Sequence, residues 1–172
     1  MNGQEVNTLS DIIVNIVTSL AIIIGGVWGY WTFVIKRQNV WNLQITLEPE
    51  IIPYSHSKRL LVIYVILRNV GQVKVTPGPK GCQLTIWKMQ SDKKEGELVL
   101  PKEGEKLIEK LDILRKYKEK GSYWHYEIEP NCQYQEMESI VVNKGVLLAI
   151  EAKFFPPEEG DYINETKVIR VT

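Results

Sequence analysis

The stretch IIVNIVTSLAIIIGGVWGYWTFVI, residues 12–35, decides the fold class of this 172-residue chain. It contains no charged residue, and a bilayer core about 30 Å thick is crossed by roughly 20 helical residues. The run is too long and too apolar for a buried strand or an ordinary core helix. We therefore expect one transmembrane helix at 12–35, preceded by a short tail at 1–11.

The flanks of this run favour an uncleaved anchor over a cleaved signal peptide. A signal peptide begins with positive charge and ends at a small-residue cleavage site, whereas Glu5 and Asp11 precede this run and aromatic residues end it. Lys36 and Arg37 follow it directly. Because basic flanks stay on the cytoplasmic side, we expect the tail 1–11 outside the cytoplasm and the C-terminal domain within it.

Aromatic and basic residues gather at the cytoplasmic end of the predicted span. Tryptophan prefers the headgroup region of a bilayer, and lysine and arginine anchor the helix end beyond it. The predicted membrane-interface anchor consists of Trp28, Trp31, Lys36, Arg37 and Trp41.

One face of the predicted helix carries small and polar residues. At about 100° per residue, one stripe about a third of the circumference wide holds Asn15, Thr18, Ser19, Ile22, Gly25, Gly26 and Gly29. Small residues let helix backbones approach closely in lipid, and Gly25 and Gly29 form a GxxxG pair. The stripe predicts packing on a second copy or on a partner helix. The alternative is that the GxxxG spacing arises by chance, because glycine is common in membrane helices.

About 130 residues follow the span, a usual size for one domain. A linker at 36–42 leads to alternating or β-branched runs separated by Gly, Pro and Asn turn signals. The predicted strands are 41–50, 60–70, 82–89, 123–129, 133–142, 146–155 and 162–171. Strands at this spacing favour one antiparallel β-domain at 43–172, either an immunoglobulin-like sandwich or a small barrel.

One segment departs from the strand pattern. Between residues 103 and 120, Leu107, Leu111 and Leu114 recur at helical spacing among lysines and glutamates, and Gly121 follows where a helix would end. We expect one amphipathic helix inserted between strands at 103–120.

The long apolar run from Leu60 to Gly71, which ends in Asn69-Val-Gly, resembles the second strand of immunoglobulin-like bacterial modules. The chain has a membrane helix, then a short basic segment and then strands. This order resembles that in uncharacterised small bacterial single-pass membrane proteins. The resemblance implies an immunoglobulin-like soluble domain and a bacterial inner-membrane location, and it implies no activity. The paired cysteines and core tryptophan of antibody domains are not met.

The sequence carries no motif that indicates catalysis. His56 and His125 lack a paired nucleophile motif, and neither they nor Cys82 and Cys132 have metal-ligand spacing. We therefore predict no catalytic residue, metal or cofactor. Basic and acidic residues balance at 21 each, so no nucleic acid polymer is expected as a partner.

The most unusual local cluster is the run Tyr123, Trp124, His125 and Tyr126. In a strand it would place aromatic side chains on both faces, so one pair could contact a ligand or protein partner at the surface. The alternative is an aromatic cover over the core.

Two functions follow from these features, and neither is enzymatic; a membrane-tethered hydrolase is a third alternative, for which the sequence offers no nucleophile or metal set. The first is a membrane-anchored assembly subunit, whose helix packs on itself or on a membrane-protein partner and whose cytoplasmic β-domain binds a partner. The second is an oligomeric membrane effector that forms a pore or lesion, gated by a ligand such as a signalling nucleotide on the β-domain. Asn15, Thr18 and Ser19 would then line a polar path. The sequence does not identify the small-molecule ligand.

Overall fold

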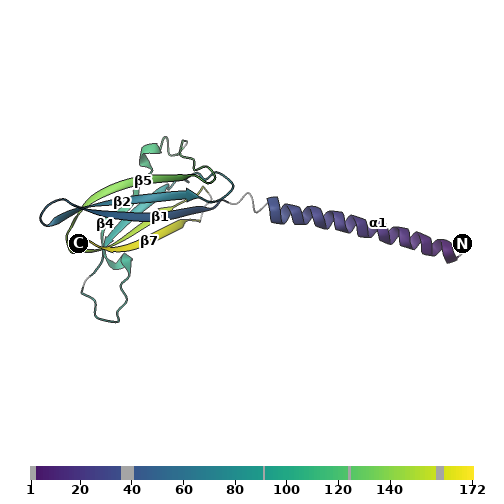
Figure 1. The fold of residues 1–172 in the computed structure, drawn as a ribbon, viewed down its shortest axis with the longest axis horizontal. Coiled ribbons are helices and arrows are strands. Elements are labelled where there is room, and N and C mark those ends of the chain that lie inside the picture. The colour runs from purple at the N-terminus through teal and green to yellow at the C-terminus, as the bar shows by residue number, and fades with distance from the viewer. Residues whose placement is uncertain (1–2, 36–40, 91, 124, 158–160) are drawn as a thin grey trace. The chain divides into compact units, whose positions relative to one another are not determined.

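The computed structural model describes residues 3–35, 41–90, 92–123, 125–157 and 161–172. The chain divides into two compact units, Met1–Val40 and Trp41–Thr172 (Figure 1). The first unit is the helix α1 (Gly3–Tyr30), which continues as the π-helical turn η1 (Trp31–Ile35). By length and composition, the segment Ile12–Val34 can cross a membrane, with a mean hydropathy of 2.1. The predicted N-terminal apolar helix is thus confirmed.

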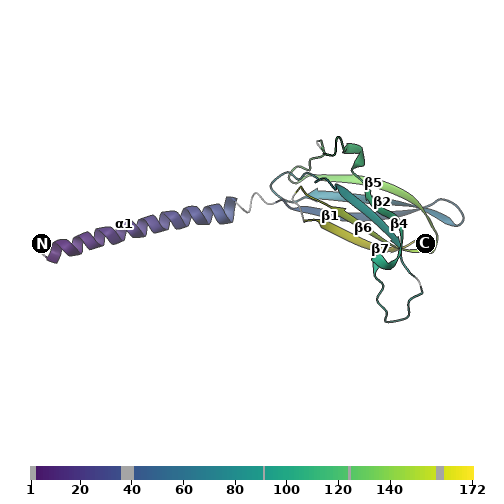
Figure 2. The same cartoon turned by 180° about the vertical axis from the view of Figure 1, so that it is seen from behind.

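The second unit is a mainly antiparallel β-domain of two sheets. One sheet has the strand order β1-β2-β5 and the other the order β4-β3-β6-β7. The first sheet lies nearer the viewer in Figure 1 and the second in Figure 2, which shows the molecule from behind. The strands are β1 (Leu43–Pro53), β2 (Lys58–Asn69), β3 (Cys82–Lys88), β4 (Glu105–Asp112), β5 (Gln133–Asn143), β6 (Leu147–Phe154) and β7 (Ile163–Arg170).

Both sheets bury one face in a shared hydrophobic core. In β1 the residues alternate between buried and exposed, because successive side chains of a strand point to opposite faces. β2 is the central strand of its sheet and contributes Leu61, Ile63, Val65 and Leu67, each with an exposed fraction of 0%. The second sheet contributes core residues from β3 and β6: Cys82, Leu84, Ile86, Leu148, Ile150, Ala152 and Phe154.

The helix predicted at 103–120 is wrong. This segment instead contains the 3-10 turn η2 (Pro101–Glu103), the edge strand β4 and a second 3-10 turn η3 (Arg115–Tyr117). Gly121 does not end a helix but occupies a turn, with a φ of 86°.

Irregular pairing of β4 explains the misleading helical spacing. β4 pairs with β3, and the register shifts between Leu84 and Ile86 and again between Ile86 and Trp87. Each shift adds a residue to β4, as in a β-bulge, so its inward side chains no longer follow a period of two. Leu107, Ile108 and Leu111 all pack against the core, at a spacing that a helix would also give.

The strand predicted at 123–129 is also wrong. Within the described residues this segment forms turns and one isolated bridge, between Val75 and Ile128. Ile128 is fully buried. The apolar side chains therefore face the core from a loop, so their alternation did not require a sheet.

Candidate functional site

The stripe predicted on the N-terminal helix is exposed from Asn15 to Gly26 and partly exposed at Gly29. None of the candidate membrane-spanning segment within Ile12–Val34 is buried against the described residues. A Cβ atom added at Gly25, Gly26 or Gly29 would meet nothing within 4 Å. Ser19 Oγ donates a 2.8 Å hydrogen bond to the backbone carbonyl of Asn15, so the hydroxyl is satisfied inside the helix.

The residues predicted as an interface anchor fall in different parts of the molecule. Trp28 and Trp31 lie on the helix and are 66% and 56% exposed. Trp41 begins the second unit and packs, partly buried, against the hydrophobic core of the β-domain. Lys36 and Arg37 lie outside the described residues. The two helix tryptophans are thus free to contact lipid, whereas Trp41 has a packing role in the domain.

The cluster at 123–126 does not form the predicted aromatic surface pair. Tyr123 and Tyr126 are 4% and 5% exposed, and the Tyr126 ring lies 4.9 Å from that of Tyr117. Trp124 lies outside the described residues. His125 is exposed. The two tyrosines belong to the aromatic cover of the core, because the loop turns them inward.

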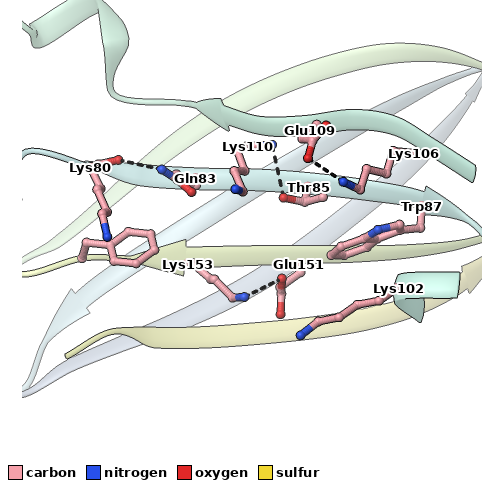
Figure 3. Close-up of a pocket in the computed structure, with 11 residues that line it drawn as sticks. Lys80, Gln83, Thr85, Trp87, Lys102, Lys106, Glu109, Lys110, Glu151 and Lys153 are labelled. Atoms are coloured by element: carbon pink, nitrogen blue, oxygen red, sulfur yellow. Dashed lines mark hydrogen bonds and ion pairs between the residues drawn. The ribbon is translucent and has the colours of Figure 1, made fainter. Parts of the chain in front are cut away.

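A cavity of about 520 Å³ opens on the face of sheet β4-β3-β6-β7 that points away from the core. On β3 its lining residues alternate with the core residues. β6 is the antiparallel neighbour, and it places Lys153 opposite Gln83 and Glu151 opposite Thr85. The lining residues, shown in Figure 3, are Lys80, Gln83, Thr85, Trp87, Lys102, Lys106, Glu109, Lys110, Glu151, Lys153 and Phe155.

The two carboxylates of this cavity are each paired with a neighbouring lysine. Glu151 accepts an ion pair from Lys153 at 3.0 Å. Glu109 accepts a hydrogen bond from Lys106, and this bond lowers the pKa of the Glu109 carboxyl. Figure 3 shows both pairs facing the hollow from opposite sides. Each glutamate of the cavity therefore has a lysine as its ion-pair partner.

Trp87 and Thr85 form the buried part of this cavity, at 5% and 8% exposed. Thr85 Oγ1 accepts a 3.3 Å hydrogen bond from the backbone N–H of Lys110, which fixes the β4 edge over β3. The Trp87 indole N–H is buried and has no hydrogen-bond partner among the described residues. An unpaired buried donor costs free energy unless a ligand or water accepts from it.

Two glutamates of β5 act as ion-pair partners. Glu136 accepts from Lys116 at 2.8 Å, and Glu138 binds Arg115 with both carboxylate oxygens. These contacts fasten η3 onto β5. Across the described ranges, no group of three His, Cys, Asp or Glu side chains is placed to hold a metal ion.

Sequence reasoning missed the lysine-lined cavity. Alternation along 82–89 does place Gln83, Thr85 and Trp87 on one face, but it cannot show which residues lie across from them. Lys106 and Lys110 were assigned to a helix. The charge cluster therefore appears only once β4 is recognised as a strand.

Comparison with known proteins gives no family. No protein-family model matches the chain, and no curated protein matches it. Two solved structures share a distant likeness. The structural-genomics target SoR45 is 14% identical, with a TM-score of 0.36, over 77% of this chain and 88% of its own. The protein YcdA of Bacillus subtilis, described as a candidate lipoprotein, is 13% identical, with a TM-score of 0.36. That match covers 76% of this chain and only 37% of YcdA.

Proposed function

We propose that this chain is a non-enzymatic, membrane-anchored interaction subunit. Its helix packs on a second copy or on a partner helix, and its β-domain binds a partner. One observation carries the proposal: the glycine-bearing helix face has no partner within the chain's described residues, since added Cβ atoms at Gly25, Gly26 and Gly29 meet nothing. In lipid, small residues let a second helix approach closely and pack against such a face.

Asn15 supports the same proposal. Its backbone carbonyl is used by Ser19, but its side-chain amide lies exposed in the apolar helix. An unpaired amide inside a bilayer is costly. A hydrogen bond to a neighbouring helix removes that cost, so Asn15 adds to the drive for assembly.

The β-domain is proposed to be an immunoglobulin-like sandwich. In that fold the chain order places strands 1, 2, 5 and 4 in one sheet and strands 3, 6 and 7 in the other. Here β4 lies at the edge of the second sheet, beside β3, and every other strand keeps its expected neighbour. Such sandwiches commonly serve as binding modules, which suits an interaction subunit.

The proposed orientation has the tail 1–11 outside and the β-domain in the bacterial cytoplasm. It rests on Lys36 and Arg37 after the span and on Glu5 and Asp11 before it. Reporter fusions test it: a C-terminal fluorescent protein should fluoresce, and a C-terminal alkaline phosphatase should be inactive. The opposite pair of results would contradict this topology. If the chain extracted from membranes is found to lack residues 1–35, the segment is instead a signal peptide that the cell has cleaved.

Assembly is tested with two differently tagged copies of the full chain. We expect one tag to recover the other from detergent extract, or to recover a membrane partner. A sample that runs as a monomer and recovers nothing would refute the proposal.

A second function, an oligomeric effector gated by a ligand, is favoured by the lysine-lined cavity. Five lysines around one hollow are suited to an anionic ligand, and Asn15, Thr18 and Ser19 would line the path between assembled helices. Induced expression should then permeabilise cells, and Asn15→Leu with Gly25→Leu and Gly29→Leu should prevent the leakage. Leakage absent under every condition favours the assembly subunit.

A further inference from the structure

We propose that the cavity on sheet β4-β3-β6-β7 binds a small molecule that carries both phosphate groups and an aromatic ring, the chemistry of a nucleotide. The inference names the ligand class for the ligand-gated function above and rests on it. The supporting observations are an excess of lysine ammonium groups, aromatic rings at the ends of the cavity and a volume that suits a small molecule.

The local charge differs from that of the whole chain. Five lysines and two glutamates line the cavity, an excess of three positive charges, whereas the whole chain is neutral. Both glutamates are already paired, Glu109 with Lys106 and Glu151 with Lys153. The excess therefore resides on the other three lysines.

Those three lysines are Lys80, Lys102 and Lys110, and none makes a salt bridge in the described part of the chain. Figure 3 shows their side chains around one hollow, reached from different elements. Each of these positive charges attracts a multiply charged anion that enters the cavity. Phosphate carries close to two negative charges near neutral pH, and lysine binds it as a point charge.

Aromatic side chains give the cavity an affinity for a flat ring. Lys80 Nζ lies 5.3 Å from the centre of the Phe155 ring, and Tyr162 packs against the same ring at 5.9 Å. A ligand phosphate that draws Lys80 away would uncover Phe155, and a base that stacks on an aromatic ring gains affinity from that contact. Trp87, at the buried end, adds an indole N–H for which the described residues offer no acceptor.

The size of the cavity agrees with this ligand class. At about 520 Å³, it lies within the roughly 300–1,000 Å³ of small-molecule sites. An anionic lipid headgroup shares the phosphate chemistry, so the experiment separates the two sources.

The test is calorimetric titration of the full chain in neutral detergent with four probes: ATP, tripolyphosphate, adenosine and short-chain phosphatidylglycerol. We expect ATP to bind most tightly, tripolyphosphate to bind more weakly and adenosine not to bind at low salt. Added NaCl should weaken ATP binding. Tripolyphosphate binding as tightly as ATP would overturn the aromatic part of the proposal. Binding of phosphatidylglycerol alone would overturn the nucleotide in favour of a lipid headgroup.

Matched variants locate the binding. Lys102→Gln with Lys110→Gln should weaken ATP about tenfold or more, close to 1.4 kcal/mol. Lys94→Gln with Lys144→Gln, which removes two exposed lysines outside the cavity, should change affinity less than about twofold. Circular dichroism confirms folding, and single Lys102→Gln replaces the double variant if that one unfolds. Equal weakening by both pairs, or no binding by the wild type, would overturn the site.

The outcomes also separate this inference from the proposed functions. ATP binding without any leakage on expression would contradict the gated effector, while the nucleotide-binding site would still be supported. Absence of ATP binding with helix association intact would remove the site and leave the assembly subunit.

Discussion

The Asn69 side chain donates a 2.8 Å hydrogen bond from Nδ2 to the backbone carbonyl of Ile128, 59 residues further along the chain. The same nitrogen donates to the carbonyl of Val73 at 2.8 Å, and the amide oxygen accepts from the backbone N–H of Gly71 at 2.9 Å. Asn69 is fully buried. This residue therefore joins the end of β2 to the loop that carries the inward-facing tyrosines.

Replacing Asn69 tests that junction. Asn69→Ala removes three hydrogen bonds made by a fully buried side chain, so we expect a loss of roughly 2–4 kcal/mol in the free energy of unfolding. Urea denaturation of the full chain in detergent measures it. Asn164→Ala, at an exposed site on β7, should change stability by less than about 0.5 kcal/mol. Similar losses in the two variants would show that Asn69 is not a junction.

A tight turn offers a stabilising substitution. Lys120 and Gly121 have φ values of 48° and 86°, and Glu119 and Ser122 exchange backbone hydrogen bonds of 2.8 and 2.9 Å across them. These are the features of a type I′ turn, which prefers Asn-Gly. Lys120→Asn should raise the free energy of unfolding by about 0.5–1 kcal/mol. The control Lys144→Asn, at a residue without positive φ, should give no gain; a gain from it alone would refute the turn argument.

The two cysteines should differ in reactivity. Cys82 is fully buried, and burial together with nearby Asp112 and Glu136 raises the pKa of its thiol. Cys132 is exposed. Because the thiolate is the reactive form, iodoacetamide should label Cys132 in the folded protein and Cys82 only after unfolding, as read by peptide mass spectrometry. Equal labelling of both before unfolding would contradict the burial of Cys82, and Cys132→Ser provides the single-site control.

Alkaline pH should weaken the fold through Tyr123. Burial raises the pKa of its hydroxyl above the ordinary value of 10.0, and a hydrogen bond to Asp112 adds to the shift. A raised folded-state pKa gives stability that is complete below pH 10 and is lost as pH rises beyond it. Tyr123→Phe should be less stable than wild type at pH 7 by about 1–3 kcal/mol. Between pH 9 and pH 11, a range of about 2 pH units that spans the ordinary tyrosine pKa, Tyr123→Phe should also lose less stability than the wild type. Parallel declines in the two proteins would refute this assignment.

Six strands could be predicted from the sequence because their side-chain pattern survives in the structure. β1 alternates, so Leu43, Ile45 and Leu47 are buried while their neighbours are exposed. β2 reads as a long apolar run, and it is the central strand of its sheet, between β1 and β5. Turn signals such as Asn69-Val-Gly71 lie where β2 ends. Local pattern and tertiary structure agree in these elements.

β4 and the 123–129 loop could not be predicted from local pattern. Two register shifts give β4 a helix-like apolar spacing, and hydrogen bonds to Asn69 hold a non-strand segment against the core. Both effects depend on partners distant in sequence. The cavity depends on the same information, since Lys153 faces Gln83 only through the β3–β6 register.

The most direct test of the central claim is energy transfer between labelled full-length chains in lipid vesicles. Gly25→Leu with Gly29→Leu places bulky side chains on the stripe and should reduce association at least about fivefold, because helix backbones can no longer approach closely. Val17→Leu with Ile24→Leu, on the opposite face, should leave association unchanged. Equal association of the stripe variant and the wild type would contradict the claim that this helix face drives assembly.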